Sequence, residues 1–105
     1  MKLKTGLMAA LLLSLPISSA VALDGEQLYN TKTCFACHGK DANTPILPIH
    51  PKLAWQNRDY LAAQMNDIKS GARANGQSAA MKGVMHLVSE EEVGAIADYL
   101  AALTP

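Results

Sequence analysis

Apolar residues recur at helical spacing in the last part of the chain. They form one stripe along a helix face: Val93, Ile96, Ala97, Leu100 and Leu103. Ser89 and Glu92 match the capping box that opens many helices, and acidic side chains at the start suit the positive end of a helix dipole. The pattern therefore predicts a helix that begins after Ser89 and reaches about Leu103.

A second helix is predicted in the middle of the chain. Its apolar or semi-polar positions follow the same spacing: Leu61, Gln64, Met65 and Ile68. Asn57 or Asp59 can cap its start, and Gly71 is a natural stop after Ser70. Asp24 can likewise cap a shorter helix from Gly25 to about Thr31.

The remaining segments favour loops. Residues 40–52 contain Pro45, Pro48 and Pro51, and prolines at this density exclude a helix. Residues 72–88 are small and mixed, with two glycines, and are predicted to be mainly loop. Because no segment predicts a strand, we expect an all-α fold of three to five helices with long loops.

The first residues have the features of a secretory signal. Lys2 and Lys4 precede an apolar run from Leu7 to Leu13, Pro16 breaks the run, and small residues at 20–22 suit a signal peptidase. The run is too short to span a bilayer, which needs about 20 apolar residues. We expect residues 1–22 to be removed, residues 23–105 to form one domain in the periplasm, and no stable membrane anchor to remain.

Charge excludes one class of partner. Lys plus Arg total 9 and Asp plus Glu total 9, so no excess of basic charge exists to neutralise nucleic-acid phosphates. After removal of the signal, acidic residues outnumber basic ones by two. A domain of this size is marginally stable by its own core and usually needs a disulfide, a metal or a cofactor.

The chemistry of the chain is concentrated in Cys34-Phe35-Ala36-Cys37-His38. This Cys-x-x-Cys-His spacing is typical of c-type haem attachment, in which two thiols one helical turn apart add to the vinyl groups of a haem. The adjacent histidine can then ligate the iron, and the haem supplies the missing core.

Three other interpretations of the motif are weaker. A thioredoxin-like redox pair needs a preceding strand and a βαβ context. A zinc site would have to recruit His50 and His86 at irregular spacing. A disulfide within so short a loop restrains little of the unfolded chain and leaves His38 unexplained.

Around this motif the chain resembles the class I c-type cytochromes, in particular one half of the bacterial two-haem periplasmic cytochromes. The similarity covers about residues 25–103 and rests on segments in the family's order: the haem motif with Gly39, Pro51-Lys-Leu53-Ala, Tyr60-Leu61-x-x-Gln64-Met65-x-x-Ile68-Lys-x-Gly71-x-Arg73, Met81-Lys-Gly-Val, Ser89-Glu-Glu-Glu and Ala97-Asp-Tyr99-Leu100. Trp55 stands where the two-haem members usually have glycine, and only one Cys-x-x-Cys-His is present.

The resemblance implies a small cytochrome c fold, with long loops wrapped around one haem c bound through Cys34 and Cys37. It makes His38 the proximal iron ligand and assigns the carbonyl that holds its ring to Pro51, with Pro48 as the rival. Arg73 and Trp55 are candidates for hydrogen bonds to the haem propionates. In the family a glycine, here Gly25, also lets the first and last helices cross closely.

The sixth iron ligand has four candidates: Met81, Met85, His50 and His86. The ligand should come from a loop that precedes the last helix and is long enough to cross the haem. Met85 and His86 lie close to Ser89, and His50 is tied near Pro51. The resemblance places the ligand methionine at Met81.

A haem iron with both axial positions filled exchanges electrons and offers no site to a substrate, and a methionine ligand raises its potential. We therefore expect a one-electron carrier, not an enzyme, between redox proteins such as a flavoprotein dehydrogenase or a terminal oxidase. Two alternatives remain: a haem subunit of a flavin-dependent sulfide dehydrogenase, and a haem sensor with an open sixth site. Lys40, Lys52 and Lys82 could attract an acidic partner.

Overall fold

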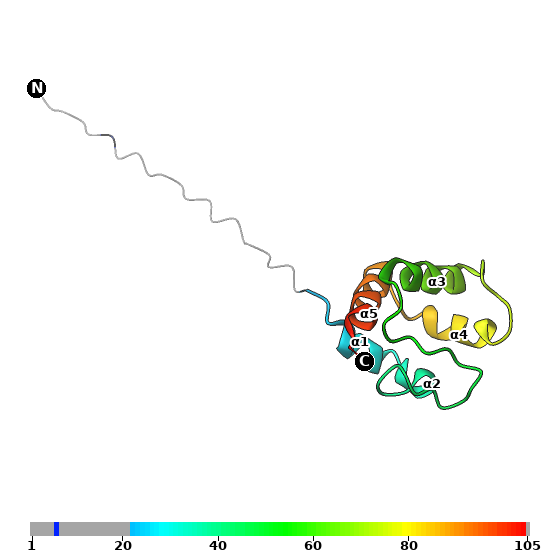
Figure 1. The fold of residues 1–105 in the computed structure, drawn as a ribbon. Helices are drawn as coiled ribbons and strands as arrows, with labels where there is room; N and C mark the ends of the chain where they lie inside the picture. The colour runs from blue at the N-terminus through cyan, green and yellow to red at the C-terminus, as the bar shows by residue number, and fades with distance from the viewer. Residues whose placement is uncertain (1–5, 7–21, 105) are drawn as a thin grey trace, which may run out of the picture.

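The fold is built from five helices, as shown by the computed structural model, which describes residue 6 and residues 22–104 (Figure 1). They are α1 (Gly25–Thr31), α2 (Phe35–His38), α3 (Arg58–Ser70), α4 (Ser78–Met85) and α5 (Glu90–Ala102). Within the described residues no strand occurs, so the all-α prediction is confirmed. The proposed signal, residues 1–22, lies almost wholly outside the described part of the chain.

The predicted caps are present. Asp24 accepts a hydrogen bond from the Gln27 N–H at the start of α1, and Asn57 accepts one from the Tyr60 N–H at the start of α3. Ser89 and Glu92 form the reciprocal capping box of α5. These hydrogen bonds satisfy backbone donors that have no partner inside the helix. Local sequence therefore fixes where three of the helices begin.

The prediction that residues 72–88 are mainly loop is wrong. Residues 78–85 form α4, which packs against α3 and carries Met81 on a helix rather than on a loop. The segment contains Ala79 and Ala80, and alanine has the highest helix propensity, while Gly83 costs only about 1 kcal/mol in a helix interior. Packing of Met85 against the core outweighs that cost.

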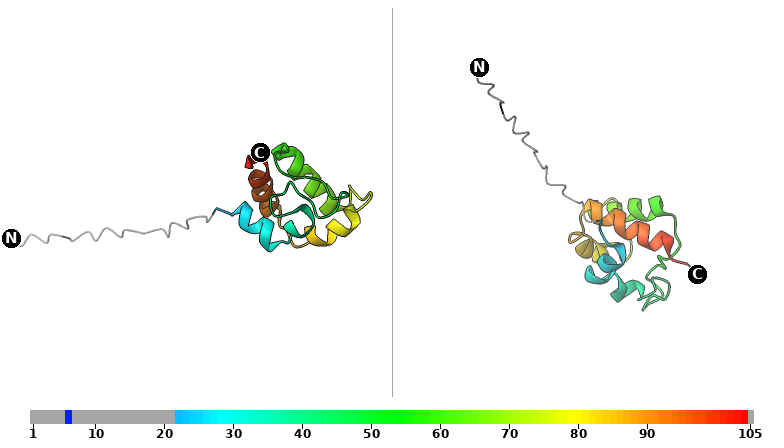
Figure 2. Two further views of the ribbon diagram at one scale, coloured as in Figure 1. Left: turned by 60° about the horizontal axis from the view of Figure 1, so that its bottom comes forward. Right: turned by 90° about the vertical axis from the view of Figure 1, so that its left-hand side faces the viewer.

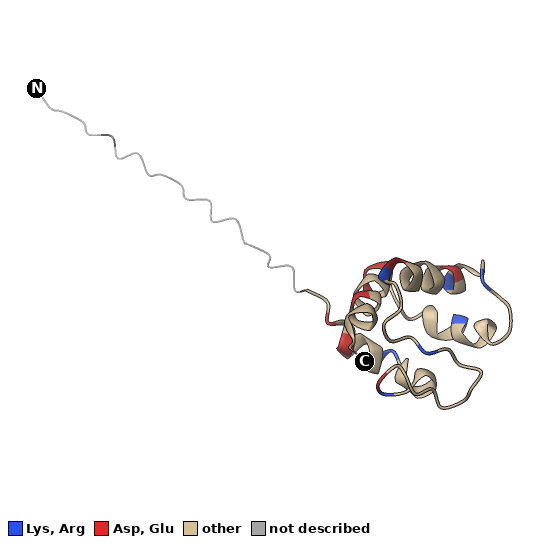
Figure 3. Cartoon of the chain, in the orientation of Figure 1, with Lys and Arg blue, Asp and Glu red and all other residues tan. Residues whose placement is uncertain are grey.

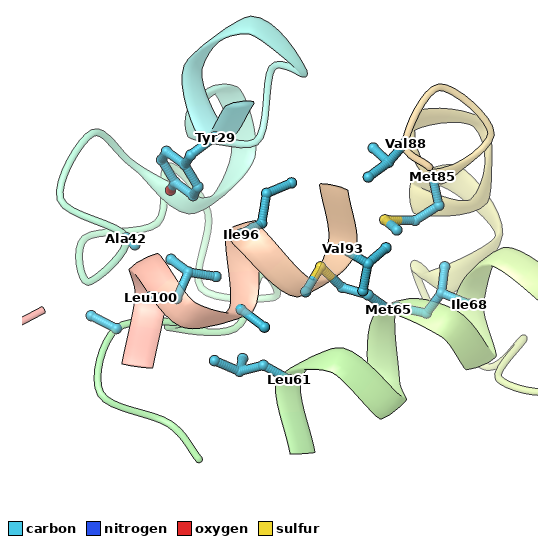
Figure 4. Close-up of a cluster of buried hydrophobic side chains, with 12 residues drawn as sticks. Tyr29, Ala42, Leu61, Met65, Ile68, Met85, Val88, Val93, Ile96 and Leu100 are labelled. Carbon is cyan, nitrogen blue, oxygen red and sulfur yellow. The ribbon is translucent and has the colours of Figure 1, made fainter. Parts of the chain in front are cut away.

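Helix α5 is the centre of the molecule, because it contacts both α1 and α3 (Figures 1 and 2). Its buried face meets side chains of α3 and of the end of α4 in one cluster (Figure 4). The largest fully buried members are Tyr29, Val88, Val93, Ile96 and Leu100. The cluster holds one end of the fold together and leaves the space between α3, α4 and the motif for the site.

Helices α1 and α5 approach each other at Gly25. A Cβ atom there would lie 2.7 Å from Tyr99 Cβ and closer still to the Ala95 carbonyl oxygen. One turn along, the Tyr29 and Tyr99 rings pack with centroids 5.8 Å apart. The close crossing predicted for a glycine at this position is therefore present.

Gly25→Val is expected to lower the free energy of unfolding by about 3 kcal/mol, because the added methyls force two backbones apart. Gly83→Ala is the matched control, since nothing lies within 4 Å of the Cβ it would add. Thermal unfolding followed by circular dichroism measures both. Equal melting temperatures for Gly25→Val and the parent protein would contradict the crossing.

Trp55 takes the conformation that glycine adopts most easily. Its φ is 69°, in the left-handed region, and its backbone N–H donates to the Leu100 carbonyl at 3.0 Å. That hydrogen bond ties the loop before α3 to the end of α5. The conformation explains physically why glycine is usual at this position in the two-haem cytochromes.

Candidate functional site

A cavity of about 350 Å³ lies beside the buried cluster. Its wall comes from α3, α4 and α5, from the motif, and from the proline loop. Six of the seven residues predicted for the site line it, and they come from separate parts of the chain: Cys34, Cys37, His38, Pro51, Arg73 and Met81. Trp55 is the exception and is not part of the lining.

The motif is held as one tight turn of helix. The His38 N–H donates to the Cys34 carbonyl at 3.0 Å, and Gly39 ends the turn with φ 87°. The Tyr29 hydroxyl donates to the Gly39 carbonyl at 2.5 Å, which fixes the turn to α1. Cys34 and Cys37 therefore stand one turn apart, as addition to two vinyl groups requires.

The two cysteines have different surroundings. Both are free thiols; Cys34 is half-buried, and Cys37 is exposed. Burial, the main cause, raises the pKa of Cys34 to about 11, with a smaller contribution from Cys37. The free Cys34 thiol is therefore protonated at neutral pH, and the Cys37 side of the motif faces the surface.

His38 is buried and oriented by its neighbour across the loop. Its Nδ1 lies 2.8 Å from the carbonyl oxygen of Pro51, not of Pro48. Because a carbonyl only accepts, Nδ1 carries the proton and Nε2 keeps a free lone pair. Burial lowers the pKa of His38, the Pro51 contact partly opposes this, and His50 lowers it further. The neutral ring is the form that binds a metal.

The methionines differ in their place at the cavity. Met65, Met81 and Met85 all line the cavity. Met81 on α4 is half-buried there, whereas Met85 is 2% exposed and lies among Val88 and Val93 in the buried cluster (Figure 4). Met65 also belongs to that cluster. Of the histidine candidates, His50 lines the cavity, with its ring centroid 6.2 Å from that of His38, and His86 is exposed outside the lining.

Arg73 and Trp55 are placed differently. Arg73 is half-buried in the cavity wall, and its NH1 donates to Gln64 Oε1 at 3.1 Å. The Trp55 side chain is 43% exposed outside the lining. Arg73 therefore lies where it could contact a cofactor in the cavity, whereas Trp55 lies outside the cavity wall.

Several polar residues of the cavity were not predicted from the sequence: Gln64, Asn75, Gln77 and Ser78. Ser78 could have been suspected from its spacing, because it precedes Met81 by one helical turn. That signal needed a helix at residues 78–85, which the sequence did not indicate.

The cavity fits a haem by the chemistry of its wall. Its lining is mainly apolar, and it brings together two thiols, an imidazole nitrogen without a partner and a thioether sulfur. A zinc site finds less support, because no group of three or more His, Cys, Asp or Glu side chains capable of holding a metal occurs in the described chain. Apolar volume with few convergent polar groups is typical of a cofactor site.

Comparison with known proteins points to the same chemistry. A sequence model of the family described as cytochrome c oxidase, cbb3-type, subunit III matches residues 20–100. Cytochrome c4 of Pseudomonas aeruginosa is 36% identical over 99 residues, which cover 91% of this chain. Cytochrome c-553 of Nitratidesulfovibrio vulgaris is 31% identical over 91 residues, 87% of each chain.

A third relative is the thiosulfate dehydrogenase electron acceptor of Stutzerimonas stutzeri, 35% identical over 85 residues, or 81% of this chain. The match covers 47% of the length of the Pseudomonas cytochrome c4 and 39% of the Stutzerimonas protein. The chain therefore spans less than half of these two relatives, and most of cytochrome c-553.

Proposed function

Because the chain belongs to the class I c-type cytochromes, with one haem c attached through its Cys-x-x-Cys-His motif, we propose that it is a periplasmic one-electron carrier. The observation that carries the proposal is the cavity, which brings Cys34, Cys37, His38 and Met81 to one apolar space. When bound there, the haem supplies an iron that alternates between Fe(II) and Fe(III).

His38 and Met81 are the proposed axial ligands. The Pro51 carbonyl holds His38 in the tautomer whose Nε2 is free, so little reorganisation accompanies iron binding. Met65, Met81 and Met85 all line the cavity, and Met81 on α4 is the one that is only half-buried, whereas the other two are buried members of the cluster. With haem bound, His38 and Met81 would both ligate its iron, which would favour electron transfer over catalysis on a substrate.

The exposed side of the motif is the proposed place of electron exchange. Cys37 lies at the surface, and its carbonyl accepts from the Ile46 N–H at 3.1 Å. Ile46, Leu47 and Ile49 beside it are 63%, 52% and 60% exposed. An apolar surface next to the thioether edge lets a partner approach closely without desolvating charges.

Charge distribution supports an acidic partner. Three basic residues, Lys69, Arg73 and Lys82, lie at the end of α3, in the following loop and on α4, whereas most acidic residues lie on α1, α5 and the start of α3, where Arg58 pairs with Asp59 and Asp98 (Figure 3). Such separation steers association with an oppositely charged surface. The proposed partners are a flavoprotein dehydrogenase as donor or a terminal oxidase as acceptor.

Export is proposed from residues 1–22. Among the described residues, no helix is both long enough and apolar enough to cross a membrane. N-terminal sequencing of the protein purified from a bacterial periplasm is expected to begin at Leu23. Recovery of the unprocessed N-terminus in the membrane fraction would contradict export by cleavage.

Carbon monoxide tests the closed ligand set. The reduced protein is expected to show no carbon monoxide difference spectrum at neutral pH, because His38 and Met81 would both ligate the iron and leave no site for the gas. A reversible one-electron potentiometric titration should accompany this result. Rapid carbon monoxide binding by the unmodified protein would instead support a sensor with an open sixth site.

A further inference from the structure

The methionine proposed as an axial ligand stands on a helix with little local support. Helix α4 covers only residues 78–85, its N-cap Gln77 makes no side-chain hydrogen bond, and Gly83 lies inside it. A helix of about two turns is unstable in water by itself, so tertiary contacts must hold it. The position of Met81 therefore depends on what fixes α4 in the fold.

Helix α3 is the element against which α4 packs (Figure 1). After α4 the chain makes a turn, in which the Val88 N–H donates to the Met85 carbonyl at 3.1 Å, and α5 begins after Ser89. Met85 and Val88 are 2% and 1% exposed in the buried cluster. The C-terminal end of α4 is thus its anchored end, whereas no side chain caps its first turn.

Lys69 makes the polar contact that joins α3 to this anchored end. Its Nζ donates to the Val88 carbonyl oxygen, 19 residues further along the chain. No backbone N–H of residues 22–104 donates to that carbonyl, and Lys69 forms no ion pair with a carboxylate in the same range. The ammonium group therefore serves a peptide carbonyl in the core, which would lose its partner without Lys69.

Lys82 bridges the same two helices in the opposite direction. A Cβ atom on Gly71, the C-cap of α3, would lie 3.1 Å from Lys82 Nζ. A cation near the C-terminal end of a helix is favourable, because carbonyl groups without partners gather there. Lys82 therefore helps to keep α4 beside α3 independently of Lys69, and loss of Lys69 should loosen α4 without releasing it.

We propose that Lys69 is a positioning residue for the axial methionine. By holding the Val88 carbonyl, it fixes the end of α4 against α3 and keeps the Met81 thioether in the cavity wall, one helical turn before Met85. Lys69 does not line the cavity, so it acts only through α4. The inference rests on the proposed function, because it assumes that Met81 ligates the iron of a haem c.

Imidazole binding measures how firmly the methionine is held. Imidazole reaches ferric iron only when the thioether has left, so its apparent dissociation constant is the intrinsic constant divided by the fraction of open molecules. Lys69→Met removes the ammonium group and keeps an unbranched side chain. We expect it to tighten imidazole binding to the oxidised holoprotein about tenfold, with a weaker red absorption band and a lower reduction potential.

Two variants separate positioning from general destabilisation. Lys69→Arg keeps a cationic donor of similar reach and should retain the parent affinity for imidazole. Lys32→Met removes another half-buried lysine, whose Nζ lies 3.6 Å from Glu92 Oε2 and joins the end of α1 to α5. Because that ion pair lies away from the contact between α3 and α4, its loss is expected to lower the melting temperature slightly and to leave imidazole affinity unchanged.

Hydrogen–deuterium exchange of the oxidised holoprotein gives a second readout. Residues 78–88 should exchange faster in Lys69→Met than in the parent, whereas residues 90–102 should keep the parent rate. If either imidazole affinity or exchange of residues 78–88 stays at the parent value in Lys69→Met, the proposal is wrong. It is also wrong if Lys32→Met tightens imidazole binding equally, because general destabilisation would then explain the effect.

The unmodified holoprotein distinguishes failure of this inference from failure of the proposed function. A parent protein that has the red band and excludes carbon monoxide, but whose Lys69→Met variant binds imidazole as the parent does, overturns the role of Lys69 alone. A parent protein that lacks the red band and binds carbon monoxide rapidly overturns both the closed ligand set and the role of Lys69.

Discussion

The chain without haem is expected to be largely unfolded. The cavity of about 350 Å³ lies against the buried cluster and would be left empty. Without haem, the apolar side chains of its wall would face water, at about 25 cal/mol for each Å² left exposed. Domains have a total stability of about 5–15 kcal/mol, and small ones lie near the lower end. A cofactor bound only by the native state therefore decides whether the fold persists.

Circular dichroism of a Cys34→Ser, Cys37→Ser chain purified without haem measures this effect. The haem-bearing parent protein is the control and should show the helical spectrum of five helices with a cooperative thermal transition. A native-like spectrum with a cooperative melt from the haem-free chain would show that the polypeptide folds without its cofactor.

Met81→Ala is expected to change the redox properties more than any other single substitution on α4. Loss of the thioether should abolish the weak red absorption band that methionine gives with ferric iron. It should also open the reduced iron to carbon monoxide and lower the potential by on the order of 100 mV, within the roughly 0.8 V that axial ligands span.

Met85→Ala is the matched control for that prediction. It removes a methionine from the same helix, but one that is 2% exposed in the buried cluster. We expect a loss of about 3 kcal/mol in unfolding free energy with the red band and the potential retained. The reverse pattern, with the band lost in Met85→Ala and kept in Met81→Ala, would identify Met85 as the ligand.

The sequence predicted the parts of the fold that are set by local signals. Asp24, Asn57 and Ser89 cap their helices because their side-chain oxygens reach backbone donors three residues away. Gly71 ends α3 with φ 91°, the left-handed conformation that glycine adopts without steric cost. None of these features depends on the rest of the chain.

Helix α4 could not be predicted in the same way, because long-range packing stabilises it. Its start has no side-chain cap, Gly83 weakens it, and Met85 contributes only after the buried cluster has formed. Polar residues of the cavity wall were missed for a related reason, because Gln77 and Ser78 line the cavity only when α4 has formed.

Haem attachment could be predicted from the motif because all its residues are close together in the sequence. Cys34, Cys37 and His38 lie within one turn, so their spacing alone indicates haem attachment. The orienting carbonyl is different, because it is 13 residues away from His38 and only the path of the proline loop decides between Pro48 and Pro51. The left-handed backbone of Trp55 could not be predicted either, because its N–H bonds to the Leu100 carbonyl, far along the sequence.

Mass spectrometry of a tryptic digest of the denatured protein tests the haem site most directly. Cleavage after Lys32 and Lys40 releases residues 33–40, which contain both cysteines and His38. The account predicts that this peptide carries one haem through two thioether bonds and that acidified acetone extracts no haem from the intact protein. A haem that is extracted, or a residue 33–40 peptide with two unmodified thiols, would contradict it.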